Sequence, residues 1–163
     1  MRMMLRLFIA VVFIQGLGSS RLWSADSPAK PAGDMLDGQK VELSNNAKVL
    51  VGANNVKVTI GPYKKGNAEG ALVWLQGIEG DLNGKVLDHR VVPGASDGKN
   101  YVTQYQGKDW ITLAMRKSYG TESWEMTVPG HNDTIKLTVD DGAAQMTDPG
   151  VVLREYTRLH KMK

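Results

Sequence analysis

The sequence predicts an all-β fold: an antiparallel meander of about nine strands, closed as a barrel or packed as a sandwich, with a C-terminal helix. Three observations favour this fold. Short β-branched segments alternate with turns rich in Asn and Gly from residue 40 onward. Two tight turns in the second half agree on one apolar face. The last residues change to a helical period. The length of 163 residues corresponds to one domain.

The first twenty residues have the order of a secretory signal peptide. Arg2 and Arg6 precede an unbroken apolar run over residues 7–14, and small residues follow. This run is shorter than the roughly 20 apolar residues that cross a bilayer. We therefore expect a signal peptide over residues 1–20, with cleavage between residues 20 and 25. A periplasmic or secreted protein follows, with no membrane span after signal removal.

The charge balance and the residue types exclude several kinds of protein. Removing residues 1–25 takes away three of the 20 basic residues and leaves 17, equal to the 17 acidic residues. No positive surplus remains to attract phosphates, so nucleic acid is not an expected partner. The chain has no Cys, which excludes a disulfide framework and a Cys nucleophile. Residues 26–38 hold two prolines and two glycines and are predicted as a linker before one β-rich domain over 39–163.

The first half of this domain predicts short strands separated by turns. Three β-branched segments, each followed by turn residues, are 41–43, 48–51 and 56–60. Gly61 and Pro62 are expected to end the third of these strands.

Asn83-Gly84 predicts a two-residue hairpin between the next two apolar segments. Strict pairing from this turn places Glu79 opposite Asp88, which brings two like charges together. We attribute the conflict to a bulge at the preceding glycines, of which Gly77 is the first.

The second half predicts a register. A two-residue turn at 119–120 places Met115 opposite Trp124 and Lys117 opposite Glu122. A four-residue loop at 129–132 then carries the same apolar face into the next strand. The predicted apolar face is Ile111, Leu113, Met115, Trp124, Met126, Val128, Ile135, Leu137 and Val139. The predicted polar face is Thr112, Arg116, Ser123, Glu125, Thr127, Thr134, Lys136 and Thr138.

A further turn at 107–108 predicts an aromatic patch on the polar face. It places Tyr105 opposite Trp110 and Thr103 opposite Thr112, with Tyr101 two residues beyond Thr103 on the same side. Flat rings on an exposed sheet stack against sugars or an apolar partner, and Arg116 is a nearby hydrogen-bonding group. Burial of the rings by sheet curvature or by the C-terminal helix is the alternative. The predicted ligand-binding residues are Tyr101, Tyr105, Trp110 and Arg116.

The C-terminus predicts a helix, with a strand as the alternative. Asp148 suits the cap of this helix and Pro149 its first turn. The apolar stripe comprises Val152, Leu153, Tyr156, Leu159 and His160.

Catalytic and metal-binding motifs are weak in this sequence. Residues 94–98 match G-x-S-x-G, but a strand rather than a helix is expected to follow, so we interpret them as a loop. His89, His131 and His160 lack the spacing of a zinc site, and we predict neither a metal nor a cofactor.

The sequence therefore predicts an exported, non-catalytic β domain that binds a ligand or partner, either a glycan or a protein. Two alternatives stay open. One is a lipocalin-like carrier with a small apolar ligand among Met115, Trp124 and Met126. The other is a small secreted hydrolase, for which no coherent set of nucleophile, base and oxyanion donors is found.

Overall fold

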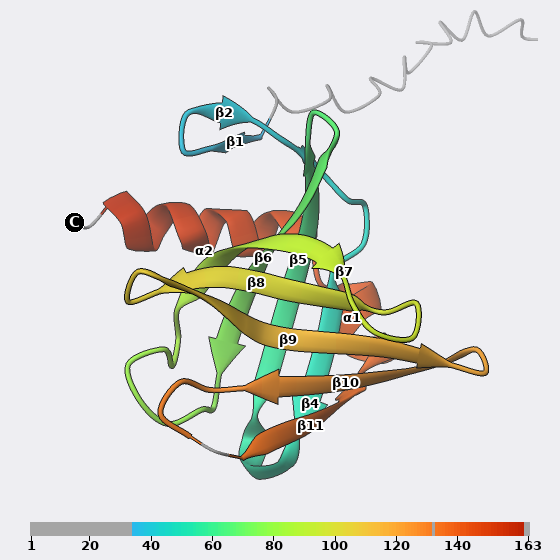
Figure 1. Cartoon of the computed structure of the whole chain (residues 1–163). Coiled ribbons are helices and arrows are strands. Elements are labelled where there is room, and N and C mark those ends of the chain that lie inside the picture. The colour runs from blue at the N-terminus through green and yellow to red at the C-terminus, as the bar shows by residue number, and fades with distance from the viewer. Residues whose placement is uncertain (1–33, 132, 162–163) are drawn as a thin grey trace, which may run out of the picture. The chain divides into compact units, whose positions relative to one another are not determined.

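The computed structural model describes residues 34–131 and 133–161. The predicted leader, its cleavage site and the start of the predicted linker lie outside these residues. The described part of the chain forms strands first and helices last (Figure 1). The elements are β1 (Met35–Leu36), β2 (Gln39–Lys40), β3 (Glu42–Leu43), β4 (Lys48–Gly52), the 3₁₀ turn η1 (Ala53–Asn55), β5 (Lys57–Lys65), β6 (Ala68–Gln76), β7 (Val86–Pro93), β8 (Lys99–Tyr105), β9 (Lys108–Ser118), β10 (Thr121–Thr127), β11 (Thr134–Val139), α1 (Asp141–Met146) and α2 (Pro149–Lys161).

The strands from β4 to β11 form an antiparallel meander that closes on itself. Each strand pairs with the next one along the chain, and β11 pairs with β4 to complete the ring. β3 pairs with β5 beyond the end of β4 and brings the sheet to nine strands. The predicted antiparallel fold of about nine strands is therefore confirmed, and it is a barrel rather than a sandwich.

The register predicted for the second half is confirmed over most of its length. Met115 lies opposite Trp124 across β9 and β10. Trp124 in turn lies opposite Leu137 across β10 and β11. These side chains fill the barrel interior together with inward residues from the other strands. The buried apolar interior is Leu50, Val56, Val58, Ile60, Ala71, Val73, Leu75, Ile78, Leu82, Tyr101, Leu113, Met115, Trp124, Met126, Val128 and Leu137.

A bulge in β9 reverses the predicted faces at two positions. Val102 pairs with Ile111 and Tyr101 pairs with Leu113, so Thr112 is an extra residue on β9. An extra residue shifts the alternation of side chains by one position. The placement of Ile111 in the core and Thr112 in solvent was therefore wrong: Ile111 is 43% exposed, whereas Thr112 is 0% exposed.

The two strands that flank Asn83-Gly84 pair as a hairpin, as predicted, but the two-residue turn between them is wrong. Trp74 pairs with Val86, so residues 77–85 form a longer connection between β6 and β7. The Asn83 side-chain oxygen accepts a hydrogen bond from the Gly77 N–H at 2.9 Å. The connection also buries two apolar side chains, Ile78 and Leu82, which close this end of the barrel.

β5 runs through the two residues that were expected to end it. A Cβ on Gly61 would lie 3.3 Å from the Val152 Cβ, so the glycine lets α2 approach the strand. The Pro62 carbonyl accepts from the Ser44 N–H at 2.8 Å. The carbonyl and the nitrogen of a strand residue face the same side of the strand. The Pro62 nitrogen therefore faces the segment between β3 and β4, where no strand residue needs an N–H donor, and the proline costs no ladder hydrogen bond.

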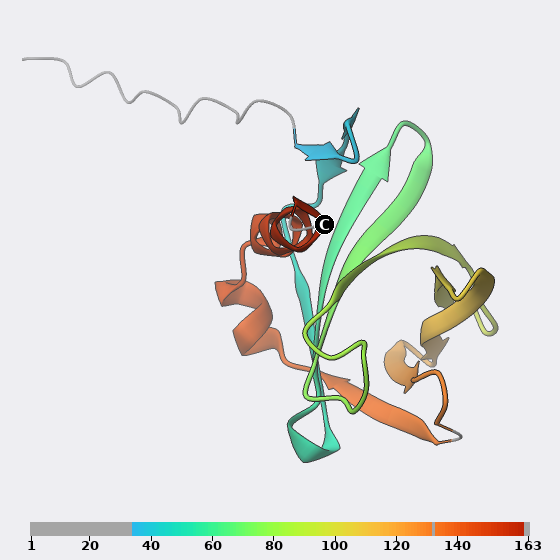
Figure 2. The same cartoon turned by 90° about the vertical axis from the view of Figure 1, so that its left-hand side faces the viewer.

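The predicted C-terminal helix is confirmed as α2. It lies outside the barrel wall that includes β5 and β6, and Figure 2 shows it nearly end-on. Asp148 accepts a hydrogen bond from the Gly150 N–H at 2.9 Å and so caps the first turn. Leu36 of the β1–β2 hairpin packs into the same layer, so the predicted linker overlaps folded structure at its end. The buried apolar layer beneath α2 is Leu36, Val41, Tyr63, Leu72, Val86, Val152, Leu153 and Tyr156.

A buried polar pair lies inside the barrel beside the bulge. His89 Nδ1 is 3.0 Å from the Leu87 carbonyl oxygen. A carbonyl only accepts, so Nδ1 carries the proton and Nε2 accepts from the Thr112 hydroxyl at 2.8 Å. Burial lowers the pKa of His89 to about 4, and the ring is therefore neutral at pH 7. The bulge thus supplies the partner that this buried ring requires.

We predict that Gly70→Ala destabilises the fold. The Tyr63 ring covers Gly70 across the β5–β6 pair, and an added Cβ would lie 2.2 Å from a ring carbon. Displacing a packed ring costs about 1–3 kcal/mol of the free energy of unfolding, measured by urea denaturation. Gly142→Ala in α1 is the control, because its Cβ meets nothing closer than 3.5 Å. Equal stability of the two variants would contradict the prediction.

We also predict that His89 makes the free energy of unfolding fall in acid. The unfolded chain binds a proton near pH 6.5, whereas folded His89 binds one only near pH 4. This contribution is therefore complete above pH 6.5 and is lost as the pH falls toward 4. The difference corresponds to on the order of 3 kcal/mol. Urea unfolding of the protein and of His89→Gln across this range tests it, and a slope unchanged in the variant would show that another group is responsible.

Candidate functional site

The structure does not bring the four predicted ligand-binding residues onto one face. Tyr101 is only 8% exposed and lies inside the barrel. Tyr105 and Trp110 are half-buried against the same interior. Arg116 lies on the outside of β9, where it pairs with Glu125 at 3.6 Å. The expected exposed patch was therefore wrong, and these residues belong to three separate places.

Two local features of β8 and β9 explain the error. The turn between them is Gln106-Gly107, both with positive φ, so Tyr105 pairs with Lys108 rather than with Trp110. The bulge at Thr112 then turns the Trp110 side chain toward the barrel interior. Gln is uncommon at positive φ, which is why a turn one residue later looked better from sequence.

Tyr105 and Trp110 lie at the end of the barrel that the 77–85 connection closes. Their ring centroids are 5.9 Å apart. They line a surface hollow of about 440 Å³ together with the β8–β9 turn and Gly130. The nearby Asp109 carboxylate is already bound by Arg90 and Gln104. These rings are therefore the wall of a closed end rather than an open platform.

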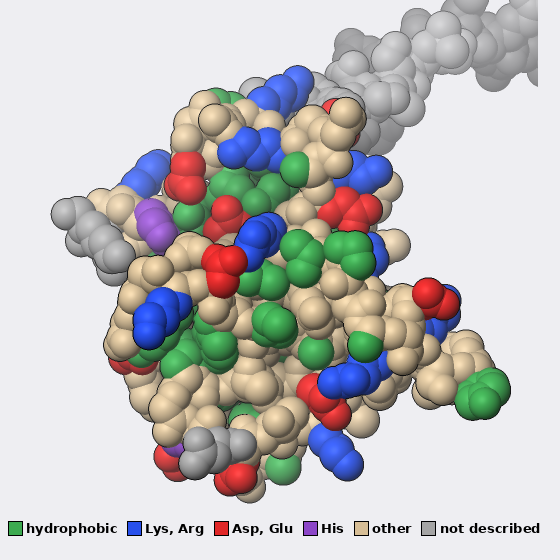
Figure 3. All heavy atoms as spheres, in the orientation of Figure 1, with side chains coloured by type: hydrophobic (Ala, Val, Ile, Leu, Met, Phe, Trp, Pro, Cys, Tyr) green, Lys and Arg blue, Asp and Glu red, His purple; other side chains and the backbone are tan. Residues whose placement is uncertain are grey.

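Arg116 lines a second, shallow hollow of about 340 Å³ on the outer face of the barrel. Ile111 and Thr127 lie beside it. Figure 3 views this side and shows hydrophobic side chains in small groups among polar and charged ones. The surface resembles ordinary solvated sheet, for which scattered apolar residues are normal.

The opposite end of the barrel is open and forms a mouth pocket of about 460 Å³. Ala71, Val91 and Tyr101 face it from inside the barrel and form an apolar floor. Charged side chains surround the opening. The residues that line the mouth pocket are Glu42, Leu43, Ser44, Asn45, Pro62, Tyr63, Lys64, Glu69, Ala71, Val91, Lys99 and Tyr101.

Tyr101 is the buried polar side chain of this pocket. Its ring lies 5.7 Å from that of Trp124, centroid to centroid. Its hydroxyl makes no hydrogen bond within residues 34–131 and 133–161 and is open to the pocket, because among these residues the fully buried side-chain atom without a partner is Trp74 Nε1. Burial raises the pKa of Tyr101 to about 12, and the charges of Glu122 and Glu69 add to the effect. At neutral pH the pocket therefore contains a protonated hydroxyl without a protein acceptor.

One ion pair lies on the rim above Tyr101. Lys99 Nζ is 2.8 Å from a Glu69 carboxylate oxygen. Lys64 lies opposite Glu69 in the β5–β6 register. The hydrogen bond and charge of Lys99, with a smaller effect of Lys64, hold the pKa of Glu69 below its ordinary value. Glu69 is therefore ionised and has two lysines beside it.

A second ion pair lies over the Trp124 ring. Lys48 Nζ is 2.5 Å from a Glu122 carboxylate oxygen and 4.9 Å from the ring centroid. The Trp124 indole N–H donates to the same oxygen at 3.2 Å. The hydrogen bond from Lys48 lowers the pKa of Glu122, and the charge of Lys117, its neighbour across β9 and β10, contributes. This glutamate also has two lysines beside it.

The starts of four strands carry a sequence signal for this mouth. Residues i and i+2 of a strand face the same side. The barrel strands β4, β6, β8 and β10 begin at the mouth. Each has a charged residue at its first or second position, and a side chain of the barrel interior follows two residues later. These pairs are Lys48 and Leu50, Glu69 and Ala71, Lys99 and Tyr101, and Glu122 and Trp124.

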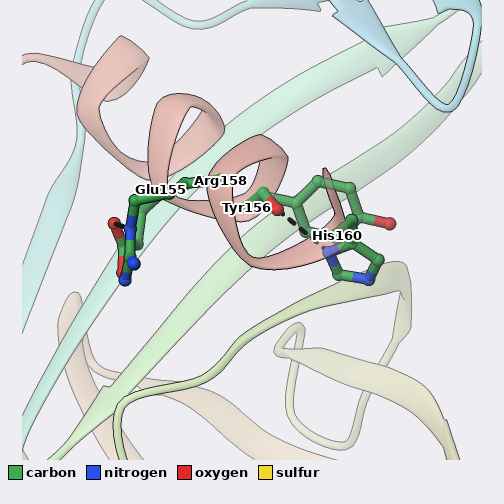
Figure 4. Close-up of polar contacts among 4 residues, drawn as sticks. All are labelled: Glu155, Tyr156, Arg158 and His160. Carbon is green, nitrogen blue, oxygen red and sulfur yellow. Dashed lines mark hydrogen bonds and ion pairs between the residues drawn. The ribbon is translucent and has the colours of Figure 1, made fainter. Parts of the chain in front are cut away.

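The polar contacts of α2 are structural. Glu155 pairs with Arg158 on the outer side of the helix, and the Tyr156 ring stacks on His160 at 3.9 Å (Figure 4). The Tyr156 hydroxyl donates to Asp37 at 3.0 Å, which fixes the β1–β2 hairpin to the helix. These groups satisfy one another and leave nothing directed toward a ligand.

The motif at 94–98 is a loop between two strands, as predicted. The Gly94 N–H donates to the Gly98 carbonyl at 2.9 Å, and Ser96 has a φ of +54°. β8 follows, so the strand–turn–helix geometry of a hydrolase elbow is missing here. Asp88 and His89 face opposite sides of β7, and Asp88 accepts from the Tyr63 hydroxyl at 2.6 Å.

In the described ranges, no three His, Cys, Asp or Glu side chains are placed to hold a metal ion. No described helix combines the length and apolar character needed to span a membrane. Comparison with known proteins finds no match: no family model fits the chain, and neither a curated protein nor a solved structure is similar to it.

Proposed function

We propose that this protein is a non-catalytic binding protein whose barrel mouth holds a small amphipathic molecule. One observation carries the proposal: the Tyr101 side chain is only 8% exposed, yet its hydroxyl makes no hydrogen bond within the described part of the chain and opens into a pocket of about 460 Å³. A donor that faces the pocket and has no protein partner is free to bond an acceptor on a ligand.

The make-up of the mouth pocket supports the proposal. Binding sites for small molecules have volumes of roughly 300–1,000 Å³ and combine apolar walls with a few placed polar groups. Here the floor is apolar, and Tyr101 is its buried donor. The charged rim lies where the polar part of a ligand would meet water. Mouths of β-barrels are among the places where such sites occur.

This site differs from both sites that the sequence suggested. The exposed aromatic patch is divided among separate surfaces. A ligand among Met115, Trp124 and Met126 would have to displace side chains that are packed and buried. The mouth pocket needs no such displacement, since it lies above this packed layer. In our proposal the protein works in the periplasm or outside the cell, as the predicted leader implies.

Binding of N-phenyl-1-naphthylamine, an uncharged fluorescent dye, tests the proposed function. We expect saturable fluorescence enhancement with one dye per chain. Val91→Phe places a ring in the mouth pocket and lowers the dye affinity about tenfold or more. Val92→Phe is the matched control, because Val92 lies on the outer side of the same strand, and we expect it to leave the affinity unchanged.

Thermal unfolding shows whether each variant is folded. If Val91→Phe does not fold, Glu69→Trp covers the same pocket from an exposed rim position and replaces it. The proposed function fails if the unmodified protein binds no dye. It also fails if pocket-filling and control variants bind the dye equally well.

A further inference from the structure

The charged side chains that line the mouth pocket balance one another. The lining contains two lysines and two glutamates, Lys64, Lys99, Glu42 and Glu69. Lys99 Nζ is 2.8 Å from a Glu69 carboxylate oxygen. Lys64 lies opposite Glu69 on β6 and opposite Glu42 on β3. Each of these charges therefore has an opposite charge beside it or across the strand pair, and the lining favours neither an anion nor a cation.

From this balance we propose that the mouth pocket selects an uncharged alcohol, whose hydroxyl accepts a hydrogen bond from Tyr101 and donates one to Glu69 and whose apolar body rests on the barrel floor. This inference rests on the proposed function and names the chemical class of its ligand. The charges near Tyr101, the exposure of Glu69 and the apolar floor support it.

The Tyr101 hydroxyl calls for an acceptor that has no charge. It is protonated at neutral pH and makes no hydrogen bond within the described part of the chain. The negative charges of Glu122 and Glu69 both act on it, so they would repel a carboxylate placed there. An ammonium group only donates hydrogen bonds and would leave the Tyr101 proton without an acceptor. A ligand hydroxyl accepts this proton without bringing a charge.

Glu69 supplies an acceptor for the proton of the same alcohol. Its side chain lines the pocket, and its charge acts on the Tyr101 hydroxyl. The hydrogen bond and charge of Lys99 hold the pKa of Glu69 below its ordinary value, so Glu69 is ionised at neutral pH. About half of the Glu69 side chain is exposed, and a carboxylate accepts several hydrogen bonds. An alcohol can therefore donate to Glu69 while Lys99 stays in place.

The floor of the pocket determines the other part of the ligand. Ala71, Val91 and the ring of Tyr101 present apolar surface. Burying a charged group against such a surface costs much more than burying a hydrogen-bonded hydroxyl. The volume of about 460 Å³ suits a molecule of one or two rings.

Calorimetric titration with three matched compounds tests the inference. At neutral pH 1-naphthalenemethanol is uncharged, 1-naphthalenemethylamine is a cation and 1-naphthoate is an anion, and all three have the same rings. We expect the alcohol to bind about tenfold tighter than either ion, with an affinity that added salt leaves unchanged. Tyr101→Phe should lower the affinity for the alcohol about fivefold. Tyr105→Phe, the same change at the closed end of the barrel, is the matched control and should leave this affinity unchanged.

Glu69→Gln tests the second contact of the alcohol. It keeps the size of the side chain but removes one of the two negative charges that act on Tyr101. It also takes the carboxylate partner from Lys99. We expect the affinity for the alcohol to fall about threefold and the affinity for 1-naphthoate to rise. An unchanged preference for the alcohol in this variant would contradict the assigned role of Glu69.

Equal affinities for the three compounds, or tighter binding of either ion, would overturn the inference. Undiminished binding of the alcohol by folded Tyr101→Phe would overturn it too. If Tyr101→Phe does not fold, Glu69→Gln at its exposed position decides instead. If these tests fail while the uncharged dye still enters the pocket, the proposed function stands and only the choice of an alcohol is wrong. Failure of the dye as well would remove the site itself.

Discussion

The pairing of β11 with β4 is the contact on which the rest of the structure depends. It joins the last strand of the meander to the first, and the Asp140 N–H extends the ladder to the Val49 carbonyl at 2.9 Å. Leu137 lies opposite Gly52 in this pair, and a Cβ on Gly52 would lie 2.9 Å from a methyl carbon of Leu137. Closure removes the free sheet edges and gives every strand an inside and an outside. The core, the mouth and the outer helix layer all follow from that division.

Alternation along the strands then decides what each side contains, and one residue changes it. Without the bulge, Thr112 would face solvent and His89 would be a buried imidazole with half its hydrogen bonds missing. The extra residue turns Thr112 inward, where its hydroxyl meets His89 Nε2. It also turns Ile111 outward, which exposes a large apolar side chain. The barrel thus satisfies a buried polar group and accepts one exposed hydrophobic residue, a favourable exchange.

The fold class and the register of β9 to β11 were predictable, because tight turns fix which residues pair and wrong pairings expose apolar side chains. The path of the chain near Tyr105 was not, because Gln106 at positive φ and a bulge leave no mark in hydrophobic alternation. The strand through Gly61 was missed for another reason: its glycine is needed by α2, a partner distant in sequence. Candidate site residues were misplaced wherever the local register depended on such features.

The stability of the fold explains the residues of the barrel interior but not the charged residues at the mouth. Apolar interior residues are required to fill the closed sheet, but half-exposed ion pairs contribute only about 0–1 kcal/mol each. Lys48, Glu69, Lys99 and Glu122 nevertheless form two ion pairs on the inward side at the mouth, and the charges of the two glutamates act on Tyr101. At the closed end the connection over residues 77–85 instead covers the core with Ile78 and Leu82. The covered end is explained by the core that it closes, whereas the open and charged end is the feature on which the proposed binding function rests.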